Sequence, residues 1–169
     1  MKNKLHPGIK WQWRLSSYFG YLFFILFFGI WIGAFVGVFI GKPLLTIFLF
    51  SFFLLIFLII LTEIWIYLAF NRWFYEFTDT NLKQERGVIW KTYSNVPYEK
   101  IQNVDIRRGI IARIMGFSAV HIQTAGYSAT SQRYGYGSEG YIPAVNIGEA
   151  ERIRDFIMKK TTQRTKGGL

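Results

Sequence analysis

The sequence offers few side chains that could perform nucleophilic, acid–base or metal chemistry. It contains no cysteine, which excludes disulfides, thiol nucleophiles and cysteine-ligated metals. Its two histidines, His6 and His121, stand far apart, and neither has neighbours at a spacing typical of a metal site or a catalytic triad. Alternation places His121 on the exposed face of a strand. We therefore predict no enzyme activity, no metal and no cofactor.

A glycine pattern near the C-terminal third resembles a dinucleotide-binding fingerprint by spacing alone. Gly135, Gly137 and Gly140 are separated as that motif requires. The motif also needs a preceding strand and a following helix, whose N-terminus meets the pyrophosphate. Here the flanks are a polar loop and a short strand, so we predict a flexible loop over 126–140.

The basic residues are the remaining chemistry, and the net charge of +10 favours an anionic partner. Arg107, Arg108 and Arg113 cluster around a tight turn, and we expect Lys100 and Arg133 nearby. We predict lipid or partner binding at Lys100, Arg107, Arg108 and Arg133, and a bracing role for Arg113. The alternative is that these charges only solvate the surface. No aromatic-basic motif accompanies them, so we expect no nucleic acid partner.

Two apolar runs dominate the N-terminal half. Residues 18–40 carry no charge, and residues 44–70 carry only Glu63. Each run exceeds the roughly 20 residues that a spanning helix needs. Gly41 can end a helix, and Pro43 is tolerated in the first turn of the next one. We predict a two-span transmembrane hairpin over 18–70.

The basic residues near the spans predict their orientation in the cell membrane. The segment before the first span contains Lys2, Lys4, Lys10 and Arg14. The loop between the spans contains Lys42 alone, whereas Arg72 closely follows the second span. Positive charge is enriched on the cytoplasmic side. We therefore expect a multi-pass protein with both termini in the cytoplasm.

Small residues recur along one face of the first span. Glycines occur at every fourth position: Gly29, Gly33, Gly37 and Gly41. Such a face admits another helix backbone closely. Either the bulky residues of the second span fill this groove within one hairpin, or the groove mediates self-association or contact with another membrane protein.

The single acid of the spans, Glu63, lies about 10 Å of helix rise from Phe70. We expect its carboxylate to reach the interface or to pair with a basic residue such as Arg72. A transport role would require further polar residues along the spans, which are absent.

After Asn71 the composition changes to short alternating runs separated by turn residues, which predicts strands. The run 109–116 is bounded by glycines and predicts a short helical turn. Asn146 and Glu149 resemble a capping box before an amphipathic helix. The fold class is thus a membrane hairpin followed by an α+β small barrel or sandwich with a C-terminal helix. The predicted domains are a basic and aromatic flank (1–17), the hairpin (18–40 and 44–70), the barrel domain (71–160) and a flexible tail (161–169).

Three stretches carry a resemblance to a known family: YEFTDTNLKQERGVIW, VPYEKIQNVDIRRGIIARIMGFSAVHIQTAG and IPAVNIGEAERIRDFI. They resemble the bacterial pleckstrin-homology-like domain of the membrane-flanked, YdbS-like type. The resemblance covers roughly residues 5–160 and implies about seven strands and a C-terminal helix. It also implies a protein partner, namely a larger multi-span relative. Lys83 and Arg86 lie at positions comparable to those where eukaryotic relatives place basic residues that bind inositol phosphates. The acidic Glu85 lies between them in this sequence.

These observations lead to a functional hypothesis. We expect a membrane-anchored binding or scaffolding module that docks a membrane protein or anionic lipid headgroups at the cytoplasmic face. The alternative is a small subunit of a transport or channel complex.

Overall fold

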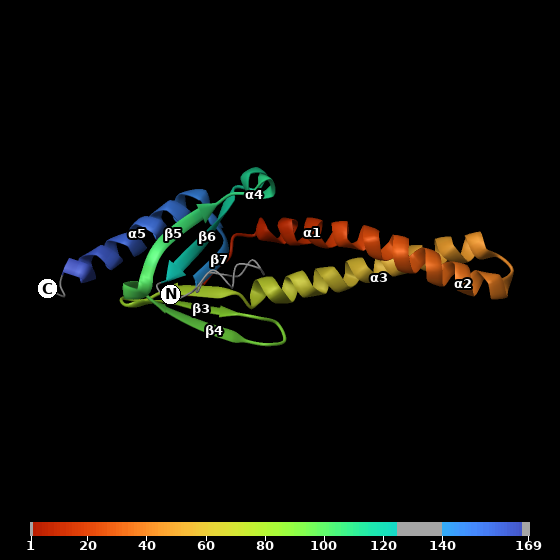
Figure 1. Ribbon diagram of the computed structural model, residues 1–169, viewed down its shortest axis with the longest axis horizontal. Helices are drawn as coiled ribbons and strands as arrows, with labels where there is room; N and C mark the ends of the chain where they lie inside the picture. Colours follow the sequence, from red (N-terminus) through yellow and green to blue (C-terminus); the bar gives the residue numbers. More distant parts are fainter. Residues whose placement is uncertain (1, 125–139, 167–169) are drawn as a thin grey trace. The chain divides into compact units, whose positions relative to one another are not determined.

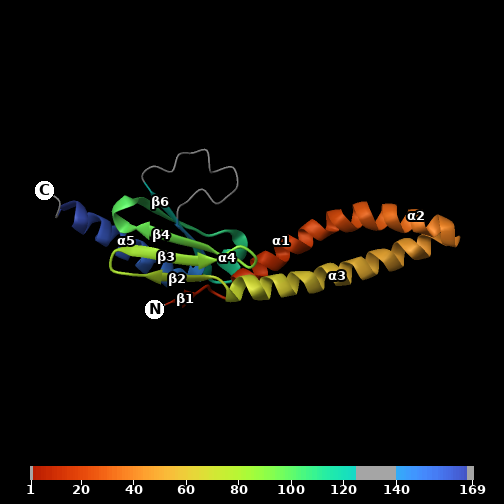
Figure 2. The ribbon, with the colours of Figure 1, turned by 90° about the horizontal axis from the view of Figure 1, so that it is seen from below.

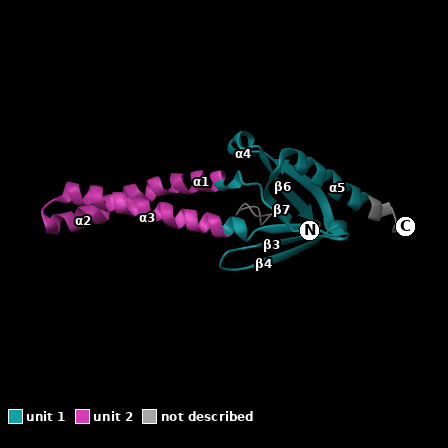
Figure 3. Cartoon of the chain, turned by 180° about the vertical axis from the view of Figure 1, so that it is seen from behind, with its two compact units in different colours: residues 1–10, 69–169 teal, residues 11–68 magenta. Residues whose placement is uncertain are grey.

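The computed structural model describes residues 2–124 and 140–166. The chain forms two compact units, which are distinguished by colour in Figure 3. Unit 1 contains residues 1–10 and 69–169, and unit 2 contains residues 11–68. Each unit is described by itself.

Unit 2 is a pair of long apolar helical segments. The first runs continuously over 32 residues through α1 (Ile9–Phe24), the π-helical segment η1 (Ile25–Gly29) and α2 (Ile30–Ile40). The second, α3 (Pro43–Asn71), has 29 residues. Both are long and apolar enough to cross a membrane. Gly41 ends the first helix in the left-handed conformation with φ of 73°, and Pro43 begins the second, as predicted.

The described residues of unit 1 form two antiparallel sheets, together with the helices α4 and α5 (Figure 1). The first sheet has the order β1 (Asn3–Lys4), β2 (Phe74–Phe77), β3 (Asn81–Arg86) and β4 (Thr92–Pro97). A 3-10 turn, η2 (Tyr98–Lys100), leads to the second sheet of β5 (Ile101–Arg107), β6 (Phe117–Thr124) and β7 (Gly140–Asn146). The short helix α4 (Ile110–Ile114) joins β5 to β6, and α5 (Ile147–Lys166) follows β7.

The core of unit 1 lies between the sheets and α5. Alternation along β6 buries Val120 and Ile122 completely, as the sequence pattern predicts. The apolar face of α5 contributes Ala150, Ile153 and Ile157. The α5 N-terminus is fixed by Asn146, whose side-chain oxygen accepts a hydrogen bond of 3.3 Å from the Gly148 amide. The family resemblance correctly implied this arrangement of sheets and terminal helix.

The N-terminal residues belong to unit 1, whereas the sequence places them in a flank before the first span. β1 pairs with β2, so that Asn3 lies opposite Tyr75 and Lys4 opposite Phe74. Leu5 and Ile9 are buried, and the His6 amide donates a hydrogen bond of 2.9 Å to the Ala144 carbonyl. Because β1 and β2 are adjacent strands of one sheet, the apolar helical pair is an insertion in the connection between them.

Two further boundaries differ from the sequence-based expectation. The apolar run 88–94 predicts a strand that begins at Val88, but β4 begins at Thr92, and residues 87–91 form a turn that starts at Gly87, with φ of 119°. The helix α5 continues to Lys166, through most of the predicted flexible tail. The predicted loop 126–140 lies outside the described residues, apart from Gly140 at the start of β7.

Candidate lipid-binding end of unit 1

The chain leaves and re-enters unit 1 at one end, and the β3–β4 turn and the connection that contains α4 lie at the same end (Figures 1 and 2). There the Lys10 ammonium lies 4.1 Å from the centre of the Phe70 ring. Arg72 donates a hydrogen bond of 2.6 Å to the Val88 carbonyl, which holds the β3–β4 turn at this end. We call this region, comprising residues 8–10, 69–72, 87–91 and 107–115, the junction end.

The helix α4 is held at the junction end by packing against the N-terminal segment that precedes α1. A Cβ atom added to Gly8 would lie 3.1 Å from Met115 Cβ and 2.8 Å from the Phe117 ring. The close approach requires glycine at this position. The His6 and Phe117 rings stack beside it, with centroids 6.0 Å apart. The segment before the first helix is therefore packed directly against the α4–β6 turn.

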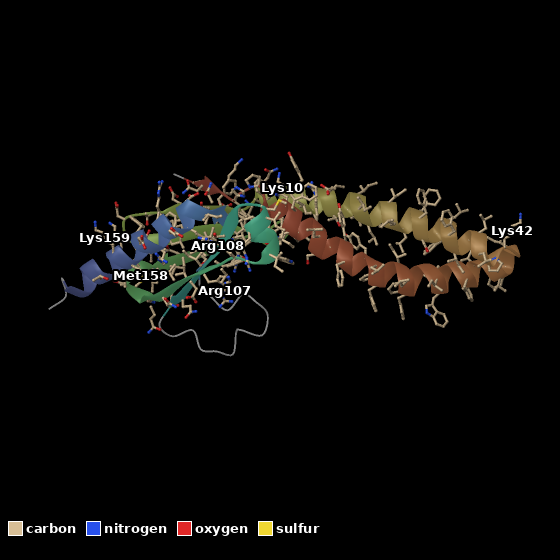
Figure 4. All side chains as sticks on the ribbon, turned by 90° about the horizontal axis from the view of Figure 1, so that it is seen from above. Lys10, Lys42, Arg107, Arg108, Met158 and Lys159 are labelled. Carbon is tan, nitrogen blue, oxygen red and sulfur yellow. The ribbon has the colours of Figure 1, made fainter. Side chains whose placement is uncertain are left out.

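The four predicted binding residues do not form one cluster. Arg107 is exposed at the C-terminal end of β5, within the junction end (Figure 4). Lys100 precedes the other end of the same strand, about 20 Å away along seven residues of extended chain. Arg133 lies outside the described residues. Among the described members of the predicted set, Arg107 is the one that is exposed at the junction end.

Arg108, and not Arg113, makes the kind of bracing contact that the sequence assigns to Arg113. Arg108 Nε donates a hydrogen bond of 2.8 Å to the buried Ser118 hydroxyl, and Arg108 Nη2 pairs with Glu151 at 3.1 Å. It thus connects β6 to α5. Arg113 is exposed in the last turn of α4. The structure differs from the expectation that Arg113 braces the turn, because Arg113 is exposed and the bond to the buried Ser118 is made by Arg108.

The pKa of His121 depends on the charge of Arg107. It is half-buried on β6, where its ring lies 4.7 Å from the Tyr141 ring, and not on a fully exposed face. Burial lowers the pKa of His121 below 6.5, the Arg107 guanidinium lowers it further, and the cross-strand Asp105 opposes both effects. Because the folded state disfavours the protonated imidazole, the free energy of unfolding decreases as the pH falls below 6.5.

Replacement of Arg107 by glutamine is expected to raise the pKa of His121, because a repelling positive charge is removed. The chain has only two histidines, so NMR titration of histidine side chains in the full-length protein resolves the effect. Lys159→Gln, on α5, is the control and should leave the titration unchanged. An unchanged His121 titration in Arg107→Gln would contradict the electrostatic coupling.

The outer face of the first sheet contains a groove of about 400 Å³. Its lining includes Lys2, Lys83 and Glu85, together with the rings of Phe74 and Tyr93. Glu85 pairs with Lys2 at 2.9 Å and with Lys91 at 3.5 Å. Lys2 holds the pKa of Glu85 below its usual range. This pairing offsets the positive charge of the groove and disfavours a tightly bound inositol phosphate there.

Within unit 2, the glycine face packs against α3. An added Cβ would lie 2.5 Å from Ser51 Oγ at Gly29 and 2.6 Å from Ile47 Cα at Gly33. At Gly37 it would collide with Pro43 and Thr46. The groove is therefore filled within one hairpin, by the backbone of Ile47 and Pro43 and by the side chains of Ser51, Thr46 and Ile47, and not by the Phe and Leu side chains that dominate the second span. Gly41 makes no such contact and acts only as the helix C-cap.

Glu63 pairs with Arg14, and the predicted partner Arg72 is instead bonded to Val88. Two parallel hydrogen bonds of 2.7 and 2.6 Å join the Arg14 guanidinium to the Glu63 carboxylate. The Tyr18 hydroxyl donates a third, longer bond of 3.3 Å to the same carboxylate. Bidentate geometry of this kind gives strong, directional pairing. It neutralises the acid and links the two helices.

The fold, with a four-stranded and a three-stranded antiparallel sheet closed by a terminal helix, is that of a PH-like module. The chain belongs to the bacterial PH domain family, whose pattern matches residues 21–161. This is not a known catalytic family. The chain is also 26% identical over 110 residues to the UPF0699 transmembrane protein YdbT of Bacillus subtilis (strain 168). The match covers 63% of this chain and 21% of that protein, so the chain spans about a fifth of its relative's length. No solved structure gives a significant match.

Proposed function

We propose that the protein is a membrane-anchored PH-like module that docks on anionic lipid headgroups at the cytoplasmic face of the cell membrane. The observation that carries the proposal is the insertion of the apolar hairpin between β1 and β2. The two helices leave large side chains such as Phe35, Phe39 and Phe53 mostly exposed. An apolar surface of this extent favours lipid over water. Similarity to a protein named as transmembrane supports the same reading.

The pairing of β1 with β2 constrains the topology of a spanning hairpin. Both ends of the hairpin return to the same sheet, so all of unit 1 lies on one side of the bilayer. The concentration of Lys and Arg outside the hairpin, against Lys42 alone in its turn, supports the cytoplasmic side. The junction end is then held at the headgroup layer by its covalent connections.

Two exposed arginines at the junction end are the proposed headgroup contacts. Arg107 ends β5, and Arg113 lies in α4 a few residues later. A guanidinium is well suited to phosphate oxygens, and each well-placed basic residue contributes about 1 kcal/mol near an anionic leaflet. The alternative of a transport or channel subunit is less favoured, because Arg14 and Glu63 neutralise each other within the described hairpin.

Lipid selectivity of the full-length protein tests the proposal. We expect spin-labelled phosphatidylglycerol to associate with the reconstituted protein several-fold more strongly than phosphatidylcholine, because each of the two arginines favours an anionic headgroup at its own contact by about 1 kcal/mol, or about fivefold. Arg107→Glu with Arg113→Glu should remove most of this preference. High salt should weaken it, because screening is strong beyond about 3 Å at 1 M.

A matched control distinguishes an effect of this site from an effect of the protein's net charge. Lys100→Glu with Lys159→Glu makes the same change in charge at exposed positions outside the junction end, and Lys159 is labelled in Figure 4. This variant should keep the preference. An equal loss in both double variants would contradict the proposed site, and no preference in the unsubstituted protein would favour a protein partner instead.

A further inference from the structure

The most exposed apolar side chains of unit 1 gather at the junction end. Among the described residues of unit 1, Ile89 is 72% exposed, Trp90 85%, Ile110 73% and Ile114 72%. By comparison, Tyr93 on β4 is 69% exposed, and Phe156 and Met158 on α5 are 38% and 39% exposed. Two surface loops thus present large apolar groups at the end from which the chain enters the hairpin.

The register of the first sheet explains why the β3–β4 turn is at this end. Lys4 at the end of β1 lies opposite Phe74, which lies opposite Glu85, which lies opposite Tyr93. Because neighbouring strands run in opposite directions, the β3–β4 turn lies at the same end of the sheet as the connection from β1 to β2. The two connections therefore emerge side by side.

The turn that carries Ile89 and Trp90 is held in place. The Arg72 bond to the Val88 carbonyl fixes it to the first residue after α3. Trp90 is two residues beyond Val88, a reach of at most about 7 Å. Gly87, with φ of 119°, permits a close approach to the Trp90 carbonyl that no other residue would allow. Trp90 consequently stays close to the end of α3.

The second loop presents a similar group. Ile110 and Ile114 are four residues apart in α4, so they share one helix face. The exposed Arg107 precedes them, and the exposed Arg113 lies between them in the sequence. Tryptophan and aliphatic side chains next to basic residues are the combination found at the boundary between headgroups and acyl chains.

We propose that Ile89 and Trp90 of the β3–β4 turn, with Ile110 and Ile114 of α4, embed in the interfacial layer of the bilayer that the hairpin crosses. We infer that lipid covers these side chains, because each loop contacts a segment that leads directly into one of the apolar helices. The inference rests on the membrane-anchored part of the proposed function. Its consequence is that unit 1 is held on the membrane by two apolar loops as well as by the hairpin, which fixes its orientation on the surface.

Site-directed spin labelling of the full-length protein tests the inference, since the chain has no native cysteine. Trp90→Cys and Ile114→Cys carry the label at the two loops, in bilayer discs of phosphatidylcholine and phosphatidylglycerol. Asn95→Cys, exposed farther along β4, is the aqueous control, and Phe35→Cys in α2 is the membrane control. Accessibility to oxygen and to a water-soluble nickel complex measures depth.

Labels at positions 90 and 114 should lie about 5–10 Å into the boundary between headgroups and acyl chains, whereas the label at position 95 should remain in water. Nickel accessibility at position 90 or 114 equal to that at position 95 would overturn the inference. If position 35 is protected in that case, the hairpin is membrane-embedded and only the loop insertion fails. If position 35 is also in water, the proposed function fails too. Dipolar broadening between Trp90→Cys labels would overturn the inference in favour of contact with a second copy.

Discussion

Replacement of Gly33 by leucine should destabilise the helical hairpin by about 3 kcal/mol, at the upper end of the cost of overpacking. The first added carbon would lie 2.6 Å from Ile47 Cα, which is backbone and cannot rotate away. The helices must therefore separate, and the contacts on either side of Gly33 are weakened. Unfolding of the full-length protein in mixed micelles with increasing dodecyl sulfate measures the loss.

Gly20→Leu is the matched control for this prediction. Gly20 lies in α1 and has no atom within 4 Å of an added Cβ, apart from its own helix and chain neighbours. Its replacement should leave stability nearly unchanged. Equal stability of Gly33→Leu and Gly20→Leu would mean that α3 does not pack on the glycine face. A change in oligomeric state of Gly33→Leu without loss of hairpin stability would restore the self-association alternative.

Removal of Glu63 has the second large expected effect. Glu63→Ala leaves the Arg14 guanidinium without the acceptor of its two short hydrogen bonds, in a helix pair that we propose to be surrounded by lipid. Breaking a buried ion pair costs about 3–5 kcal/mol. We expect about 2 kcal/mol here, because 41% of the Glu63 side chain is exposed in the protein and the pair lies near one end of α3.

Reversal of the pair provides the control. Arg14→Glu with Glu63→Arg keeps both charges and should recover most of the stability lost in Glu63→Ala, measured by the same unfolding assay. Asp155→Ala removes a carboxylate from the exposed Arg154 pair and should have little effect. No loss in Glu63→Ala would show that Arg14 reaches the headgroups without needing its partner.

Local patterns in the sequence predicted much of the fold. The length and uniformity of the apolar runs indicated two long helices, and Gly41 with Pro43 located the turn between them. Period-two alternation indicated the inward residues of β6, and the bounding glycines indicated α4. These features depend on neighbouring residues, which the sequence displays directly.

The features that escaped prediction depend on distant residues. β1 has only two residues, and its partner β2 follows some seventy positions later, so no local period reveals it. In the sequence, the apolar residues Leu5 and Ile9, which are buried in the structure, were the indication that this segment belongs to the core of unit 1. Arg14 and Glu63 are 49 residues apart, and only the antiparallel packing of two helices brings them together. Trp90 was missed because the exposure of a turn residue cannot be inferred from its type.

The most direct test of the account is the side of the membrane on which each part of the chain lies. Lys42→Cys places a thiol in the turn between the helices, labelled in Figure 4, and Lys100→Cys places one in unit 1. In intact bacterial cells, a membrane-impermeant maleimide should label position 42 readily and position 100 only after permeabilisation. Labelling of both positions from outside, or of position 100 alone, would contradict a cytoplasmic PH-like module with a membrane-crossing hairpin inserted between its first two strands.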